Sequence, residues 1–210
     1  NKLHPRISIS GRWIMIVYLL ITVLCAVSLR LCGMGVFDSI NHALTTAATG
    51  GFSTKNASIA YFNSHTIEYV ITFFMFLSGI NYGLLFFVAF RGQIRKLIED
   101  TQFKWYVMFL ILFTAIVGIG LFISTPYNAS ASLRNALFHV TAIITTTGFT
   151  STDYTLWPPF IWMILGLCFY FGACAGSTTG GMKIIRIAVL VKSMRNEFNR
   201  ILHPNAVLPV

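Results

Sequence analysis

The chain has 210 residues, of which 56% are hydrophobic and only 10% are charged. Soluble domains carry about a quarter charged residues, so the composition excludes a soluble domain, a disordered chain and a secreted disulfide scaffold. The net charge of +9 does not indicate a nucleic-acid binder, because a chain with 19 Phe and a mean hydropathy of +0.73 is too apolar. The composition predicts an integral membrane protein.

Four stretches are long and apolar enough, or nearly so, to cross a membrane. A helix needs roughly 20 residues to span a hydrocarbon core of about 30 Å. In chain order the stretches are 13–31, 66–90, 105–123 and a fourth that begins at Pro158. The second contains Ser78, Gly79, Asn81 and Gly83, and is still interpreted as one span. The fourth runs apolar to Cys174, meets a glycine-rich break, and resumes over 184–191.

Two further stretches, 36–49 and 133–147, are compatible with helices but are semi-polar and too short to span. Each runs into a Thr-Gly step and then a Ser/Thr-rich segment. Irregular backbone at membrane depth is tolerated only where protein or a water-filled cavity covers it. A surface loop would explain either stretch alone. Because the pattern occurs twice at the same place in the order of elements, it favours re-entrant pore helices.

The distribution of charge predicts the orientation. We place the N-terminal segment, the 91–104 loop and the C-terminal segment on the cytoplasmic side, which then carries twelve basic and three acidic residues. The outer segments carry three of each. All of the excess positive charge therefore lies inside, as the positive-inside rule requires. Both short helices then enter the membrane from outside.

The order helix, short helix, Thr-Gly segment, helix occurs twice along the chain. Residues 48–54 and 146–152, aligned at an offset of 98, match at Thr, Gly, Ser and Thr. The predicted fold class is an all-α membrane protein made of two helix–pore-helix–helix modules. The predicted parts are a cytoplasmic lead-in over 1–12, a module over 13–90 with its filter in 36–54, a cytoplasmic loop over 91–104, a module over 105–195 with its filter in 133–152, and a cytoplasmic tail over 196–210.

This arrangement fits the chemistry of cation dehydration. A permeating alkali cation exchanges its water shell for fixed oxygens, which a ring of backbone carbonyls supplies. Glycine allows positive φ and so turns successive carbonyls toward one axis, and the negative C-terminal ends of the short helices favour a cation. Neither Thr-Gly segment contains an acidic residue. A monovalent cation is therefore favoured over Ca²⁺, whose sites typically include carboxylates.

Three segments carry a family resemblance: TAATGGFST at 46–54, TTTGFTST at 145–152 and, most specifically, GACAGSTTGGMKIIR at 172–186. They resemble the TrkH/KtrB/HKT superfamily of potassium transporters, and the tail RNEFNRILHPNAV at 195–207 is most similar to the TrkH branch. Members of that family have four modules around a pseudo-fourfold pore, and the resemblance implies that this chain holds the second and third. The filter positions it implies are Ala48, Thr49, Gly50 and Gly51 in one module, and Thr146, Thr147, Gly148 and Phe149 in the other.

The break at 172–183 is the second functional element. Glycine costs about 1 kcal/mol per residue relative to alanine in a helix, so the fourth span should fail here. The resemblance implies an intramembrane loop beneath the filter that obstructs the pore and moves to open it. Its residues are Gly172, Gly176, Ser177, Thr178, Thr179, Gly180, Gly181 and Lys183. Ala173 and Thr179 stand where glycine is usual in the family, which implies a stiffer loop.

A phosphate-binding loop is a competing interpretation, since Gly176 and Gly181 have the spacing of GxxxxGK[ST]. It fails because Met182 occupies the lysine position and no strand precedes the segment. Lys183 lies about one turn inside the predicted cytoplasmic boundary, where an ionisable group suggests function by default. Its ammonium either snorkels to the interface or raises the barrier for cations near the closed loop.

Other polar and sulfur-containing side chains are expected to have structural roles. His42 and His139 occupy similar places on the two pore helices, and a metal site would need more ligands than the sequence shows. We therefore expect both to be packed or hydrogen-bonded. Glu68 is expected to pair or to face water. Cys25, Cys32, Cys168 and Cys174 form no CxxC pair and are interpreted as buried small hydrophobic residues.

The sequence thus predicts a non-enzymatic subunit for K⁺ uptake, with K⁺ as the transported ion and no bound cofactor. A Na⁺-permeable or Na⁺-coupled transporter of the same superfamily and a non-transporting membrane scaffold remain as alternatives. The resemblance implies a multi-pass homodimer in the bacterial inner membrane with a cytoplasmic nucleotide-binding regulatory subunit of the TrkA type. The basic strips could bind anionic lipid or dock a partner. Asn1 in place of Met suggests a piece of a longer protein.

Overall fold

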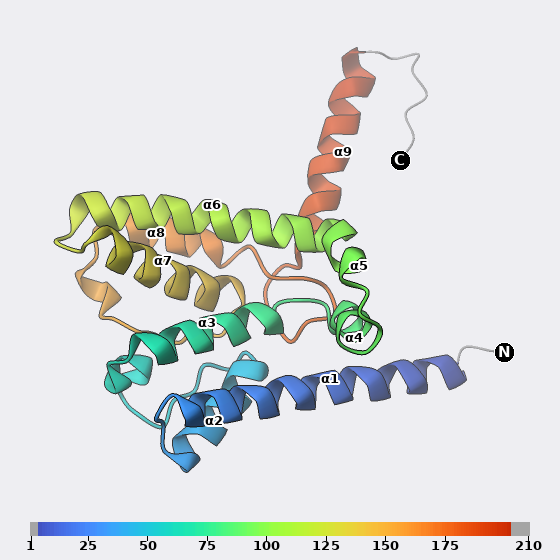
Figure 1. Cartoon of the computed structure of the whole chain (residues 1–210). Coiled ribbons are helices and arrows are strands. Elements are labelled where there is room, and N and C mark those ends of the chain that lie inside the picture. The colour runs from blue at the N-terminus through green and yellow to red at the C-terminus, as the bar shows by residue number, and fades with distance from the viewer. Residues whose placement is uncertain (1–3, 203–210) are drawn as a thin grey trace.

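The computed structural model describes residues 4–202, with side chains described over 11–200. The ends of the predicted lead-in and tail, 1–3 and 203–210, lie outside the described residues. Within the described part the chain is helical, apart from loops and one isolated bridge between Phe171 and Met182. Two helical modules lie side by side (Figure 1). The all-α fold with two helix–pore-helix–helix modules is confirmed.

The first module contains α1 (His4–Leu31), α2 (Val36–Ala47), the 3-10 helix η1 (Ser58–Phe62), α3 (His65–Ser78) and α4 (Tyr82–Arg91). Gly33, with φ of 96°, lets the chain reverse between α1 and α2. Arg30 at the end of α1 donates a hydrogen bond from Nη1 to Met34 O at 2.9 Å. This tight turn lays the short helix α2 back against α1.

The predicted second span over 66–90 is wrong as a single helix, because α3 and α4 are bent by 106°. The backbone of the break is hydrogen-bonded to a distant segment. Gly79 O accepts from Cys174 N–H at 3.1 Å, and Tyr82 N–H donates to Gly176 O at 3.1 Å. The Asn81 side chain accepts from the first N–H groups of α4 and caps it. These contacts satisfy the groups that a helix bend leaves free.

The second module contains α5 (Ile94–Glu99), α6 (Thr101–Ser124), α7 (Ala129–Ile144), the 3-10 helix η2 (Tyr154–Leu156), α8 (Pro159–Cys168) and α9 (Ile184–Leu202). α6 packs against α7, and α8 and α9 both contact α6. Asp100 caps α6 by accepting from Phe103 N–H at 3.0 Å. The predicted pore helices over 36–49 and 133–147 correspond to α2 and α7, which pack against α1 and α6 in the same way.

The fourth predicted span ends earlier than the hydropathy indicates. α8 has ten residues, about 15 Å of helix, and the chain is non-helical from Phe169 to Lys183. Gly172 N–H donates to Met182 O at 3.0 Å. The start of the loop therefore pairs with its end, and the helix does not continue. A Cβ at Gly172 would lie 2.7 Å from Gly180 O. Glycine is therefore required where the loop closes on itself.

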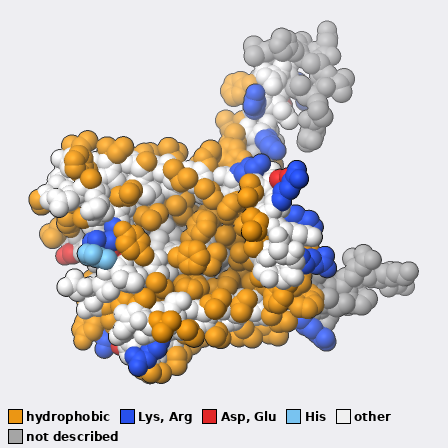
Figure 2. Space-filling view, viewed as in Figure 1, with side chains coloured by type: hydrophobic (Ala, Val, Ile, Leu, Met, Phe, Trp, Pro, Cys, Tyr) orange, Lys and Arg blue, Asp and Glu red, His pale blue; other side chains and the backbone are white. Residues whose placement is uncertain are grey.

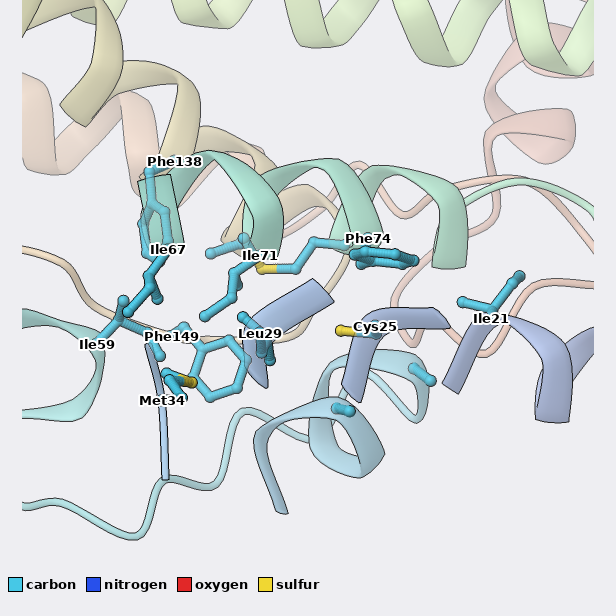
Figure 3. Close-up of a cluster of buried hydrophobic side chains, with 14 of the residues drawn as sticks. Ile21, Cys25, Leu29, Met34, Ile59, Ile67, Ile71, Phe74, Phe138 and Phe149 are labelled. Atoms are coloured by element: carbon cyan, nitrogen blue, oxygen red, sulfur yellow. The ribbon is translucent and has the colours of Figure 1, made fainter. Parts of the chain in front are cut away.

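Each module has a buried apolar cluster, and the two modules share residues at their junction. Phe138 and Phe149 of the second module pack in the cluster of the first, Phe149 beside Leu29 and Met34 and Phe138 beside Ile67 (Figure 3). α3 of the first module also packs against α7 of the second. The four cysteines are free. Cys25, Cys168 and Cys174 are buried as expected, whereas Cys32 is only half-buried.

Among the described residues, Gly11–Leu31 and Thr101–Ser124 are long and apolar enough to cross a membrane, and the bent pair α3–α4 would make a third span. Figure 2 shows hydrophobic side chains over the middle of one face, with most Lys and Arg gathered at the end where α5 and the start of α9 lie. The basic end thus lies beside the apolar band, and the side of the membrane on which it lies stays a prediction.

Candidate functional site: two filter segments and an intramembrane loop

The two pore helices end in the same backbone conformation. Thr49 and Gly51 have φ of 52° and 66°, and Thr146 and Gly148 have φ of 54° and 81°. The expectation that glycine supplies positive φ in both segments is confirmed at Gly51 and Gly148. A left-handed threonine two residues earlier was not expected, because a β-branched residue is disfavoured at positive φ.

The hydrogen bonds after each helix show that the two segments are 97 residues apart. Gly50 N–H donates to Thr45 O at 2.7 Å, and Thr147 N–H donates to Ala142 O at 2.8 Å. The predicted offset of 98 is therefore wrong by one residue. It aligned the two Thr-Gly dipeptides, which the folded backbone does not superimpose. The signal that could have revealed the register is the histidine pair, since His42 and His139 are also 97 residues apart.

The corrected register changes which residues are equivalent. Thr145, which the sequence reasoning missed, corresponds to Ala48, and its hydroxyl donates to Thr141 O at 2.7 Å. Phe149 corresponds to Phe52, not to Gly51. Phe149 is 1% exposed and packs in the core of the first module, whereas Phe52 is 77% exposed. The Phe149 side chain therefore faces the protein, which leaves only its backbone for a role at the filter.

The loop over 172–183 contacts both filter segments. The Thr49 hydroxyl lies 3.1 Å from Thr178 O and 2.7 Å from Ala48 O, so these two carbonyls share its proton. Gly180 N–H donates to the Thr146 hydroxyl at 2.7 Å. The equivalent left-handed threonines of the two modules thus bind the same loop. The Thr178 hydroxyl donates to Ala47 O, the last carbonyl of α2, at 3.0 Å. The structure therefore brings the loop and both filter segments together.

Lys183 lies against this loop. Its ammonium donates to Thr179 O, to the Thr179 hydroxyl at 3.0 Å and to the Ser177 hydroxyl at 3.5 Å. Thr179 is 4% exposed, and its hydroxyl supplies an oxygen that a glycine at this position would lack. This is the geometry of a positive charge held at the loop. It is not the geometry of a side chain that snorkels away from it.

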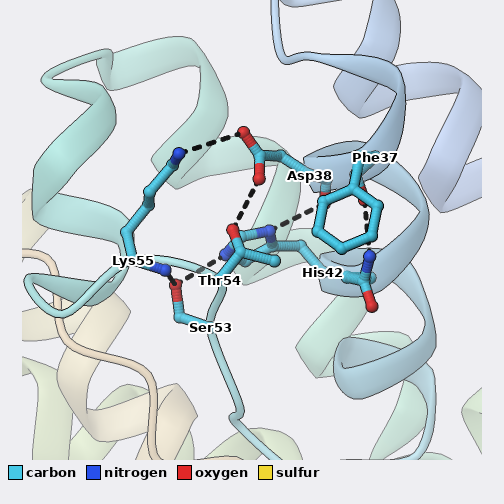
Figure 4. A network of polar contacts seen from close by, with 7 residues as sticks. Phe37, Asp38, His42, Ser53, Thr54 and Lys55 are labelled. Carbon is cyan, nitrogen blue, oxygen red and sulfur yellow. Dashed lines mark hydrogen bonds and ion pairs between the residues drawn. The ribbon is translucent and has the colours of Figure 1, made fainter.

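A polar network joins α2 to the residues that follow its filter segment (Figure 4). His42 Nδ1 donates to Asp38 O at 2.7 Å, because a carbonyl can only accept. Its Nε2 then accepts from the Ser53 hydroxyl at 2.9 Å. The Thr54 hydroxyl donates to Asp38 Oδ1 at 2.6 Å, and Lys55 Nζ lies 3.7 Å from Asp38 Oδ2. This network holds 53–55 against their own pore helix.

The second module lacks this network. His139 Nδ1 donates to Asn135 O at 2.9 Å, as His42 does to Asp38, so both histidines are hydrogen-bonded as expected. His139 Nε2, however, is buried without a hydrogen-bond partner among the described residues. Its ring packs instead against Trp157, with centroids 4.8 Å apart.

A buried ion pair links the two modules. Arg134 Nε at the start of α7 lies 2.7 Å from Glu68 Oε2 at the start of α3, and the two side chains are 17% and 8% exposed. Neither atom has a well-aligned hydrogen bond, so the contact is an ion pair in which each charge offsets the burial of the other. The expectation that Glu68 either pairs or faces water is met by pairing.

Comparison with known proteins finds similar sequences over the whole chain. A sequence model of TrkH, described as a cation transport protein, matches residues 1–210. The chain is 38% identical over 211 residues to the Trk system potassium uptake protein TrkH of Salmonella typhimurium and to that of Escherichia coli K12. It is 35% identical to TrkH of Halomonas elongata. Each match covers the whole chain but only 44% of the relative.

A solved structure shows the same fold. The potassium transporter TrkH from Vibrio parahaemolyticus superimposes with a TM-score of 0.93 at 35% sequence identity. The match covers all of this chain and 46% of that protein. The chain thus spans somewhat less than half the length of the relatives it matches.

Proposed function

The chain belongs to the TrkH family of cation transport proteins, and we propose that it forms two of four modules of a K⁺ uptake protein, the second and the third. The observation that carries the proposal is the pair of equivalent filter segments, both bound to one intramembrane loop. Its relatives in Salmonella typhimurium and Escherichia coli are potassium uptake proteins, which agrees with this geometry. Two segments cannot surround an ion, so the complete pore needs two more.

The ion site consists of backbone carbonyls at the ends of α2 and α7. Positive φ at Thr49 and Gly51, and at Thr146 and Gly148, orients successive carbonyls so that they replace water around a cation. Neither segment contains a carboxylate, which favours a monovalent ion. The proposed ligand-bearing residues are Ala48, Thr49, Gly50 and Gly51, with Thr146, Thr147, Gly148 and Phe149, to which the register adds Thr145.

The loop acts as the gate. It forms hydrogen bonds with the last carbonyl of α2 and with the hydroxyls of both left-handed threonines. Ions therefore pass only when these hydrogen bonds break. Lys183 stabilises the closed loop through Thr179 and repels cations beneath the filter. The flexible residues of the gate are Gly172, Gly176, Gly180 and Gly181, and its polar contacts come from Ser177, Thr178, Thr179 and Lys183.

The complete protein works as a homodimer in the bacterial inner membrane, with the basic end of the molecule in the cytoplasm. Basic residues on α5 and α9, such as Arg95 and Arg195, bind anionic lipid headgroups there or dock a cytoplasmic nucleotide-binding subunit of the TrkA type.

Rubidium uptake tests the proposal. The complete gene is expressed in a bacterial host that lacks K⁺ uptake systems, with Gly148→Leu as the test variant and Gly33→Leu as its control. Both glycines have positive φ, and a Cβ at either would meet nothing within 4 Å, so backbone strain is matched. We expect uptake to be lost in Gly148→Leu and retained in Gly33→Leu.

Three outcomes separate the candidate functions. Uptake of Rb⁺ that a tenfold excess of Na⁺ does not inhibit supports K⁺ transport. Strong inhibition by Na⁺, or uptake that requires Na⁺, would support the Na⁺ alternative. Absence of uptake in the complete wild-type protein at normal membrane levels would instead support a scaffold.

A further inference from the structure

The residue that follows the second filter segment is held by the first module. Thr150 N–H donates to the Ser58 hydroxyl at 3.3 Å. Thr150 O accepts from Ile59 N–H at 3.0 Å and from Ala60 N–H at 3.3 Å. Both backbone groups of Thr150 therefore bind η1, a 3-10 turn that lies 90 residues earlier in the chain. Gly148, the left-handed glycine of the second filter segment, is only two residues before this contact.

η1 is itself anchored to the first pore helix. Ser58 N–H donates to Lys55 O at 3.0 Å, and Lys55 Nζ lies 3.7 Å from Asp38 Oδ2 on α2. Ile59 is 1% exposed and packs in the same apolar cluster as Phe149 (Figure 3). A continuous set of contacts thus connects α2, through η1, to the second filter segment.

Ser58 has a conformation that its residue type disfavours. Its φ is 53°, in the left-handed region where glycine is unstrained and asparagine is tolerated. Glycine at this position would make the turn easier to form, but it would remove the hydroxyl that accepts from Thr150 N–H. The backbone conformation alone does not explain serine here, whereas the contact with Thr150 does.

We propose that Ser58 is a positioning residue for the second filter segment, and that η1 sets the carbonyl geometry at Gly148 and thereby the discrimination between K⁺ and Na⁺. The proposal rests on the filter role of residues 146–149 given above. It assigns part of the selectivity to a residue outside the filter and in the other module. A purely structural turn would affect folding without affecting the choice of ion.

The test compares substitutions of Ser58 in the complete protein. Ser58→Gly removes the acceptor and relieves the strain, so we expect an unchanged or higher melting temperature in detergent. The ratio of the Na⁺ inhibition constant to the Rb⁺ KM should fall, by at most about fivefold, the factor that the whole free energy of one hydrogen bond would give. Ser58→Asn, whose side-chain oxygen can accept and which tolerates positive φ, should restore part of the ratio.

Ser64→Gly is the matched control. It is the same substitution a few residues away, at the N-cap of α3, where the side chain makes no capping hydrogen bond. We expect its ion ratio to equal that of the wild type. Purified protein yield and melting temperature are measured for every variant, so that loss of fold is separated from loss of selectivity.

The test separates a failure of the Ser58 role from a failure of the proposed filter. A wild-type ion ratio in Ser58→Gly, with uptake abolished in Gly148→Leu, would overturn the positioning role alone. If Gly148→Leu also transports normally, the filter assignment itself is wrong. An equal fall of the ratio in Ser58→Gly and Ser64→Gly would show a general effect of loop flexibility and would also overturn the proposal.

Discussion

The two proposed filter segments, 48–51 and 145–148, have the same backbone conformation but are held by different contacts. After the first segment, Ser53 and Thr54 are held by His42 and Asp38 of their own module. After the second, Thr150 is held by η1 of the other module. The same backbone conformation is therefore stabilised by different contacts in the two modules. The residues that follow the first segment are thus held by their own module, whereas Thr150 after the second segment is held by the other module.

The positive-φ glycines of the two segments also have different surroundings. A Cβ at Gly51 would lie 1.8 Å from Thr147 O, whereas a Cβ at Gly148 would meet nothing within 4 Å. Gly51 is thus where the first segment abuts the second, and Gly148 has open space on the side where a Cβ would project. The difference predicts that matched substitutions in the two modules have unequal effects.

The largest effect is expected from Gly51→Ala. The new methyl group overlaps a backbone oxygen that side-chain rotation cannot move, so we expect little folded protein and no rubidium uptake. Gly148→Ala adds only the strain of a left-handed alanine, about 1–2 kcal/mol, and should fold. Gly33→Ala, with φ of 96° and no nearby atom, is the strain control. Equal yields for Gly51→Ala and Gly33→Ala would show that the two segments do not touch.

A smaller effect is expected when the ion pair between the modules is broken. Glu68→Gln leaves the buried guanidinium of Arg134 without a countercharge, which typically costs about 3–5 kcal/mol. The melting temperature of the complete protein in detergent should fall accordingly. The double variant Glu68→Gln with Arg134→Met leaves no unpaired charge and should recover much of the loss. A double variant no more stable than the single one would contradict a direct pairing.

The smallest effect is expected from single hydroxyl deletions behind each filter. Ser53→Ala removes the donor to buried His42 Nε2 and should cost about 1–3 kcal/mol. Ser151 Oγ in the second module is buried and has no hydrogen-bond partner in the part of the chain that the structure describes, so Ser151→Ala should be neutral or slightly stabilising. Thermal unfolding of both variants side by side checks the contrast. Equal losses would mean that the two modules are supported alike.

Much of the fold could be predicted because its signals are local. The pore helices predicted over 36–49 and 133–147 are α2 (Val36–Ala47) and α7 (Ala129–Ile144). They could be predicted because a short semi-polar run that ends in a glycine-rich segment is a pattern of neighbouring residues. The bend between α3 and α4 was not predicted. Ser78 and Gly79 are tolerated in membrane helices, and the bend depends on hydrogen bonds to Cys174 and Gly176.

The alignment of the two proposed filter segments could not be predicted from the sequence either. Side-chain identity allowed either Gly50 or Gly51 to correspond to Gly148, and the Thr-Gly dipeptide favoured the wrong one. Backbone hydrogen bonds decide the register, and they are not encoded in any one residue type. The left-handed threonines were missed for a related reason, because their strain is offset by contacts with a loop more than 30 residues away.

The sequence by itself determined that this is a membrane protein, that it contains two repeated modules, and that its basic residues gather at one end. These properties follow from hydropathy, helix propensity and charge, which act on neighbouring residues. Only the tertiary structure decided that Ser58 meets Thr150 and that Glu68 meets Arg134. Such pairs form only when one module packs against the other, so their partners depend on the whole arrangement.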